Sequence, residues 1–105
     1  LSEFYTKVFG KPNFQQDDWY GYDVEGSGIM IGKHSEVHGQ NDSPGRIMAM
    51  LTVKDVEKEF ERLEELGVKI IARPYNPDPE NSPDMLLATI ADPDGNYVQI
   101  ATPWE

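Results

Sequence analysis

Gln99 stands in the middle of an alternating segment, Tyr97–Ala101, at a place where a carboxylate would suggest a metal ligand. The segment follows DPDGN, in which Gly95 supplies a positive φ and Asn96 tolerates one, so a tight hairpin turn is predicted. Glutamine can bind a cation through its amide oxygen, but it brings no negative charge. Hard divalent ions need several oxygen or nitrogen donors, and carboxylates offset their charge best. Gln99 alone therefore does not establish a metal site.

Other residues with catalytic chemistry are few. The chain has no cysteine, which excludes a disulfide, a thiolate metal site and a cysteine nucleophile. His34 and His38, with Glu36 between them, lie in a polar stretch where no helix would hold both rings on one face. We interpret them as solvated linker residues. The sequence shows no Ser–His–Asp order, no phosphate-binding glycine loop and no paired carboxylates on one strand face, so the catalytic residues stay unknown.

The composition indicates one globular domain and argues against two classes of binding partner. The chain has 105 residues, of which 38% are hydrophobic and 27% are charged. Its net charge of −10 argues against binding to nucleic acid or to anionic membrane. There is no apolar run long enough to span a bilayer and no secretory signal pattern, so we expect a cytoplasmic protein. The chain opens on LSEFY without a methionine, and we expect that its start is cut.

Helical spacing of apolar residues predicts two helices. The first covers residues 1–9, with Ser2 as its N-cap and Gly10 as its C-cap glycine. Asp55 caps the second helix, and Gly67 ends it. One face of the second helix is apolar and consists of Val56, Phe60, Leu63 and Leu66.

Alternation and turn residues predict the strands. Their ranges are 14–16, 19–25, 28–34, 46–53, 68–73, 85–91 and 97–101. A polar linker covers 34–45. The stretch PYNPDPENSP, residues 74–83, is too rich in proline for regular structure and predicts a stiff surface loop.

These elements form an internal repeat. The first half has a helix, a glycine and three strands, and the second half has the same order after one leading strand. The repeated unit is therefore a strand, a helix and three strands, and the first copy lacks its leading strand, which would end just before Leu1. We predict an α+β domain over residues 1–105, with a first module at 1–38, a linker at 39–45 and a second module at 46–105.

Three segments resemble the vicinal oxygen chelate superfamily, which includes glyoxalase I, bleomycin-resistance proteins and extradiol dioxygenases. They are LSEFYTKVFG, LTVKDVEKEFERLEELGVKI and ADPDGNYVQI. The resemblance implies two βαβββ modules whose mixed sheets curl into a cup, with a ligand and usually a divalent metal inside. The family's metal ligands fall here on Gln99, on Met48, within 29–31 (Ile, Met, Ile) and on the absent strand. One amide with thioether and aliphatic side chains does not suit a divalent ion, so we predict no cofactor and keep a divalent metal as the alternative.

Period-2 alternation assigns the strand faces. One aliphatic face, expected under the helices, consists of Ile47, Ala49, Leu51 and Val53 together with Val98 and Ile100. The opposite face would line the cup. We predict as ligand-binding residues Met48, Met50, Gln99, Tyr97, Arg46, Trp19 and Met30, with Tyr22 as a further candidate. Flexible methionines and aromatic rings suit a small, partly apolar ligand.

Three functions compete. The first is a metal-free protein of the glyoxalase/bleomycin-resistance type that binds a small molecule. The second is a metal-dependent lyase, isomerase or dioxygenase, and the third is an assembly or regulatory module without a ligand. Each candidate residue also has a structural alternative, since the methionines could fill the core and Arg46 could be an ordinary surface residue. We expect a homodimer, because the superfamily commonly pairs its modules and an unpaired sheet edge invites a partner strand.

Overall fold

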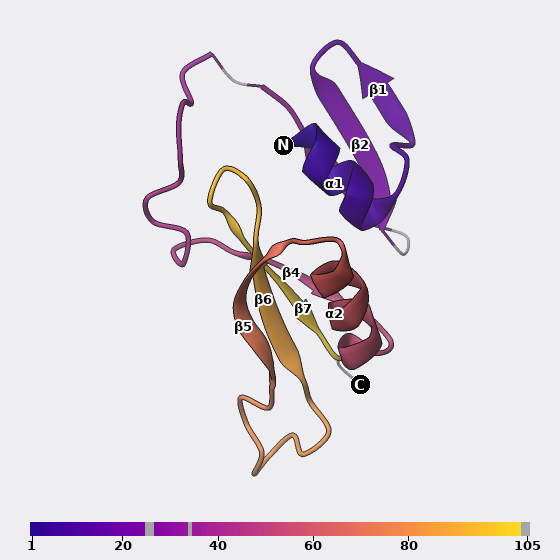
Figure 1. Ribbon diagram of the computed structural model, residues 1–105, viewed down its shortest axis with the longest axis vertical. Coiled ribbons are helices and arrows are strands. Elements are labelled where there is room, and N and C mark those ends of the chain that lie inside the picture. The colour runs from indigo at the N-terminus through magenta and orange to yellow at the C-terminus, as the bar shows by residue number, and fades with distance from the viewer. Residues whose placement is uncertain (25–26, 34, 104–105) are drawn as a thin grey trace. The chain divides into compact units, whose positions relative to one another are not determined.

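The computed structural model describes residues 1–24, 27–33 and 35–103. Contacts divide the chain into two units, Leu1–Gly39 and Gln40–Glu105. Among the described residues, each unit contains one β-sheet and one helix. Figure 1 shows how the helices and strands follow one another along the chain. The predicted α+β class is confirmed. Within the described residues, no helix is long and apolar enough to cross a membrane.

The first unit is a three-stranded antiparallel sheet with a helix on one face. Its elements are α1 (Ser2–Phe9), β1 (Phe14–Gln16), β2 (Trp19–Val24) and β3 (Ser27–Ile31), and the strand order is β1-β2-β3. The hydroxyl of Tyr22 on β2 shares a hydrogen bond of 2.8 Å with Thr6 Oγ1 and donates one of 3.2 Å to the Ser2 carbonyl. The centroid of the Phe9 ring lies 5.6 Å from the centroid of the Tyr22 ring. Tyr22 is thus packed under α1, and its candidacy as a ligand-facing residue was wrong.

The second unit contains the order β-α-β-β-β. Its elements are β4 (Ala49–Thr52), α2 (Val56–Glu65), β5 (Lys69–Tyr75), β6 (Leu87–Ala91) and β7 (Tyr97–Ala101). The strand order is β4-β7-β6-β5, with β4 parallel to β7 and the other pairs antiparallel. The sheet is therefore mixed, as predicted. Helix α2 buries Val56, Phe60 and Leu63 and packs against β5 and β6.

The helix ends are set by three residues that the sequence identified. Gly10 and Gly67 have φ values of 91° and 82°, and the Asp55 carboxylate accepts a hydrogen bond of 3.1 Å from the Lys58 backbone N–H. Two predictions were wrong. Helix α1 begins at Ser2 itself, so Leu1 holds the cap position and no side chain caps the helix. Leu66 is the C-cap residue of α2 and is 39% exposed, so it does not belong to the buried face.

Several strand boundaries differ from the predicted ones. Strand β4 begins at Ala49 because the preceding residues turn, with the Arg46 N–H bonded to the Ser43 carbonyl at 3.1 Å. Ile47 is 85% exposed and Ala49 is also exposed, so the predicted aliphatic face does not extend over them. Strand β3 ends at Ile31 and β6 begins at Leu87, while Glu25 and His34 lie outside the described residues.

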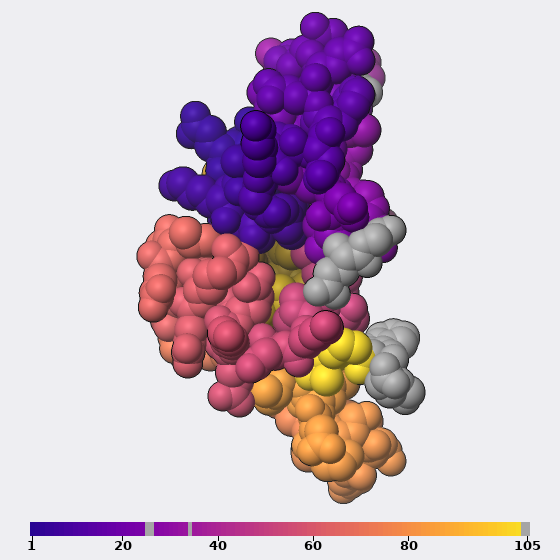
Figure 2. All heavy atoms as spheres, turned by 90° about the vertical axis from the view of Figure 1, so that its right-hand side faces the viewer, coloured from indigo at the N-terminus to yellow at the C-terminus, as the bar shows by residue number. Residues whose placement is uncertain are grey.

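Strand β5 continues to Tyr75, through Pro74, which the sequence placed in an irregular loop. Since β5 is an edge strand, a proline can be accommodated with its nitrogen on the side that faces no strand. The rest of the proline-rich stretch is a loop that projects beyond the sheet, drawn in orange in Figures 1 and 2. Its bends are held by Asn76, whose amide donates to the carbonyls of Ser82 and Pro83 at 2.9 and 3.0 Å.

The DPDGN turn between β6 and β7 is confirmed, with Gly95 at a φ of 83°. The second positive φ, predicted for Asn96, was wrong: within the described ranges Asp17 is the non-glycine residue that has one. Asn96 instead donates its amide to the Asp92 carboxylate at 2.9 Å and accepts a bond of 2.9 Å from the Asn41 amide. Residue 41 of the polar linker is thereby fixed to the turn.

An ion pair joins α2 to β5, and it leads to a prediction of how stability depends on pH. Arg73 donates to both Glu64 oxygens, at 2.7 and 3.2 Å, and this hydrogen bonding holds the pKa of the Glu64 carboxyl below its ordinary value of 4.5. A carboxyl with a lowered pKa in the folded state stabilises the fold above its unfolded pKa, and this contribution is lost as the pH falls through the folded pKa. Because both groups are exposed, we expect only a small effect on stability. Arg73→Gln should raise the Glu64 pKa in a carboxyl NMR titration, and an unchanged pKa would contradict the ion pair in solution.

Candidate functional site

The candidate site lies on the face of the four-stranded sheet that points away from α2. The Arg73 guanidinium lies 4.9 Å from the centre of the Phe60 ring of α2, so Arg73 points toward the helix. Its neighbour Ala72 lies between two register shifts of β5, and alternation with Arg73 assigns it to the opposite face. Ala72 is aligned with Thr89 of β6, and Thr89 with Gln99 of β7. The residues of this cross-strand row therefore share the face opposite α2.

The row ends on β4, where Met50 is aligned with Gln99. Exposure increases along it, from the buried Thr89 through the half-buried Gln99 to the exposed Met50. The Gln99 amide nitrogen lies 3.5 Å from Thr89 Oγ1, a long hydrogen bond that leaves the amide oxygen for another partner. The face thus places one polar amide beside an accessible thioether. The sequence missed Thr89, although a polar residue inside the apolar run LLATIA is a signal that could have identified it.

The structure assigns the other predicted residues of this unit as follows. Tyr97 is half-buried and, two residues from Gln99, shares its face. Met48 is exposed and directly precedes β4. Arg46 is exposed and lies in the turn before the strand, so it is outside the sheet. The predicted alternation of β7 is correct for Val98 and Ile100, which are buried.

Trp19 and Met30 belong to the first unit, where both are exposed. They occupy β2 and β3 on the face opposite Tyr22, since Gly21 is aligned with Met30 and neighbouring residues alternate. Within the histidine pair that the sequence considered, His38 is exposed and His34 lies outside the described residues.

The donor set does not fit a divalent metal at the positions that the resemblance implied. Gln99 supplies a neutral amide, Met48 a soft sulfur, and residues 29–31 only aliphatic and thioether groups. Throughout the described ranges 1–24, 27–33 and 35–103, no three His, Cys, Asp or Glu side chains gather closely enough to hold a metal ion. The pKa shifts occur on the other side of the sheet, around α2. There Glu59 raises the pKa of the Arg62 guanidinium by hydrogen bonding, and Glu64 does the same for Arg73.

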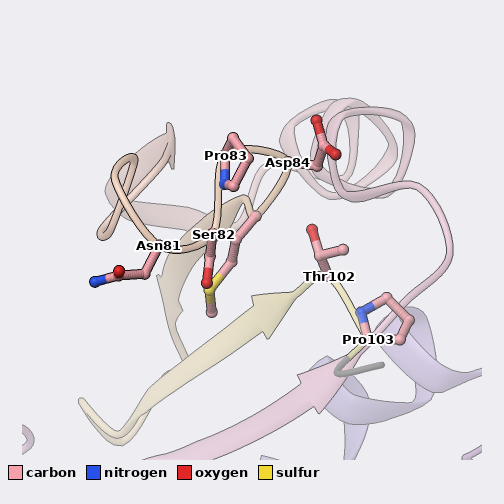
Figure 3. Close-up of a pocket in the computed structure, with 7 residues that line it drawn as sticks. Asn81, Ser82, Pro83, Asp84, Thr102 and Pro103 are labelled. Carbon is pink, nitrogen blue, oxygen red and sulfur yellow. The ribbon is translucent and has the colours of Figure 1, made fainter.

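A separate hollow of about 620 Å³ lies between the proline-rich loop and the end of β7 (Figure 3). It is lined by Asn81, Ser82, Pro83, Asp84, Met85, Thr102 and Pro103. Two of its polar side chains are already used by the fold. Thr102 Oγ1 accepts a bond of 2.9 Å from the Leu86 N–H, and the Asn81 amide lies 3.3 Å from Asp78 Oδ1. These two side chains therefore already have hydrogen-bond partners within the chain.

Comparison with known proteins agrees with this fold. No curated protein sequence matches the chain. TioX from Micromonospora sp. ML1 is 17% identical, with a TM-score of 0.74 over 96% of this chain and 85% of that one. A glyoxalase-related enzyme from Fulvimarina pelagi is 23% identical, with a TM-score of 0.71 over 97% and 77%. The fosfomycin resistance protein FosX from Listeria monocytogenes is 12% identical, with a TM-score of 0.71 over 98% and 81%. At these identities the structures show a shared fold.

The family comparison is more specific. The model of the Glyoxalase/Bleomycin resistance protein/Dioxygenase superfamily matches residues 2–100, which is nearly the whole chain. The matched range contains both helices, the DPDGN turn and the row that ends at Met50. The chain therefore belongs to the glyoxalase/bleomycin resistance protein/dioxygenase superfamily.

Proposed function

We propose that this chain binds a small, partly apolar molecule on the open face of its four-stranded sheet, without a metal ion. The observation that carries the proposal is the row Thr89–Gln99–Met50, which places one amide between a buried hydroxyl and an exposed thioether. An adaptable thioether suits apolar ligands of variable shape. The Gln99 amide oxygen can orient such a ligand by accepting a hydrogen bond from its N–H or O–H group.

The description of the superfamily names bleomycin resistance proteins as well as dioxygenases, so membership is compatible with a binding role. Metal-dependent lyase or dioxygenase chemistry would need a set of hard donors, which the side chains at positions 48, 50 and 99 do not provide. Binding and sequestration of a small molecule need no such donors and require only the side chains of Thr89, Gln99 and Met50.

A ligand screen by thermal shift tests the proposal. A compound that binds only the folded state at 100 times its Kd should stabilise the protein by about 2.7 kcal/mol. Gln99→Ala should keep the melting temperature of the free protein nearly unchanged and remove most of the shift for polar-ended compounds. Gln15→Ala is the matched control, because Gln15 is an exposed strand glutamine of the other unit.

Two results would contradict the proposal. The first is stoichiometric Fe, Mn, Ni or Zn in the purified protein, measured by inductively coupled plasma mass spectrometry. The second is a broad panel of compounds in which none shifts the melting temperature. If Gln99→Ala and Gln15→Ala leave the ligand-induced rise in melting temperature equally unchanged, the ligand binds elsewhere than at this row.

A further inference from the structure

Two polar side chains in the hollow beside the proline-rich loop are not used by the fold. Ser82 is half-buried, Asp84 is exposed, and both line the hollow (Figure 3). Within the residues that the structure describes, neither the Ser82 hydroxyl nor the Asp84 carboxylate has a hydrogen-bond or ion-pair partner. A hydroxyl and a carboxylate are therefore available to a molecule that enters the hollow.

The loop that carries these side chains is fixed by its own hydrogen bonds. The Asn76 oxygen accepts a bond of 2.9 Å from the Asp78 N–H, and the Asp78 carbonyl accepts one of 2.8 Å from the Ser82 N–H. The Ser82 carbonyl accepts a further bond of 3.1 Å from the Met85 N–H. Because the loop has this shape before anything binds, a ligand need not order it, and such preorganisation favours affinity.

The charges near the hollow favour a cation. From residue 74 to residue 105 the sequence contains six acidic residues and no lysine, arginine or histidine. The last basic residue of the chain, Arg73, already donates to both oxygens of Glu64. This part of the chain therefore supplies no cation for the Asp84 carboxylate, and a positively charged ligand would supply one.

The remaining walls of the hollow are apolar. They consist of the rings of Pro83 and Pro103 and the thioether side chain of Met85. The volume of about 620 Å³ lies within the range of small-molecule sites. A bare metal ion needs several hard donors, whereas an organic cation can use one carboxylate and also cover the apolar walls. One charged group on an apolar body is thus the chemistry that fits this hollow.

We propose that the hollow binds a small organic ammonium compound. Its ammonium group pairs with the Asp84 carboxylate, and its apolar body lies against Pro83, Met85 and Pro103. The Ser82 hydroxyl is left to bond a second polar group of the ligand. None of the residues of the row Thr89–Gln99–Met50 lines the hollow, so this site is separate from the one in the proposed function and does not depend on it.

The test is an NMR titration of the full chain with four probes: cyclohexylmethylammonium, cyclohexylmethanol, cyclohexanecarboxylate and methylammonium. The first carries both charge and body, and each of the others lacks one or reverses the charge. We expect cyclohexylmethylammonium to shift the amide resonances of Asp84, Met85 and Thr102 saturably and to have the lowest Kd. Added salt should raise this Kd, because the ion pair is exposed.

Asp84→Asn removes the charge and keeps the shape of the side chain. It should raise the Kd of cyclohexylmethylammonium about fivefold, near the upper end for an exposed ion pair, and leave that of cyclohexylmethanol unchanged. Glu80→Gln is the matched control, because Glu80 is an exposed acid of the same loop that does not line the hollow. It should change neither Kd by more than about twofold.

Ser82→Leu is a second variant that leaves the carboxylate in place. The larger side chain should occupy part of the hollow and abolish the saturable shifts of both cyclohexyl probes. Ser43→Leu is the control, because Ser43 is an exposed serine of the same unit outside the hollow. Circular dichroism melts should show all variants folded.

Each alternative result overturns the inference. Such results are equal Kd values for the ammonium and the alcohol, equal effects of Asp84→Asn and Glu80→Gln, or no saturable shift with any probe. If Gln99→Ala weakens the ammonium probe while the Asp84 and Ser82 variants do not, the ligand lies at the row. The proposed function would then stand without this second site. A thermal shift that depends on Gln99 tests the row independently of these probes.

Discussion

Replacing Leu63 with alanine is expected to lower the free energy of unfolding by about 3 kcal/mol, within the range measured for buried Leu→Ala changes. Leu63 has 0% exposure and lies on the inner face of α2 beside Phe60. The substitution removes apolar contacts and leaves a cavity that the surrounding sheet can fill only in part. Urea unfolding followed by far-UV circular dichroism measures the loss.

The chain offers a matched control three residues away. Leu66 follows α2 and is 39% exposed, so Leu66→Ala should cost less than about 1 kcal/mol, as surface changes usually do. Hydrogen exchange at the β6 amides should accelerate in Leu63→Ala, because α2 packs beside this strand. Equal losses in the two variants would contradict the packing described for α2.

Replacing Asp92 with alanine is expected to cost about 2–3 kcal/mol, because a buried carboxylate that accepts several hydrogen bonds is lost. Its Oδ1 accepts from the backbone N–H groups of Asp94 and Asn96 at 3.0 and 2.9 Å, and its Oδ2 accepts from the Asn96 amide at 2.9 Å. Alanine would leave these donors without their acceptor in a partly buried turn. The turn joins the strands that carry Thr89 and Gln99.

Graded variants make the prediction specific. Asp92→Asn keeps one oxygen and should lose less than Asp92→Ala. Asp94→Ala is the control, because Asp94 serves the turn through its backbone N–H and its carbonyl, which accepts from Asn41 at 2.7 Å. It should change stability by no more than about 0.5 kcal/mol. Denaturant unfolding measures all three, and similar losses for Asp92→Ala and Asp94→Ala would show that the Asp92 carboxylate does not stabilise the turn.

Local chemistry made parts of this fold predictable from the sequence. The Asp55 cap, the glycines that end both helices and the DPDGN turn depend on conformations that a few residues determine by themselves. Tyr97–Ala101 was predicted with its exact bounds because a tight turn fixes where the strand begins. The family resemblance depended on the same segments and is confirmed.

Contacts between distant segments decided the rest. Alternation could not tell that β4 begins only at Ala49, because the turn that contains Arg46 ends the extended run. From its neighbours in the sequence, Pro74 is expected to interrupt a strand. It is tolerated in β5 because the sheet order makes β5 an edge strand. Tyr22 and Trp19 belong to one aromatic strand, and only the position of α1 decides that Tyr22 is covered and Trp19 is not.

The sequence by itself determined the order of elements, the Asp55 cap and the glycines that end both helices, since these depend on residue types and on neighbours in the chain. The tertiary structure decided which side chains meet. The row of Thr89, Gln99 and Met50 joins three strands through their register. Such pairings arise from the hydrogen-bonding partners of each strand, which no local pattern encodes.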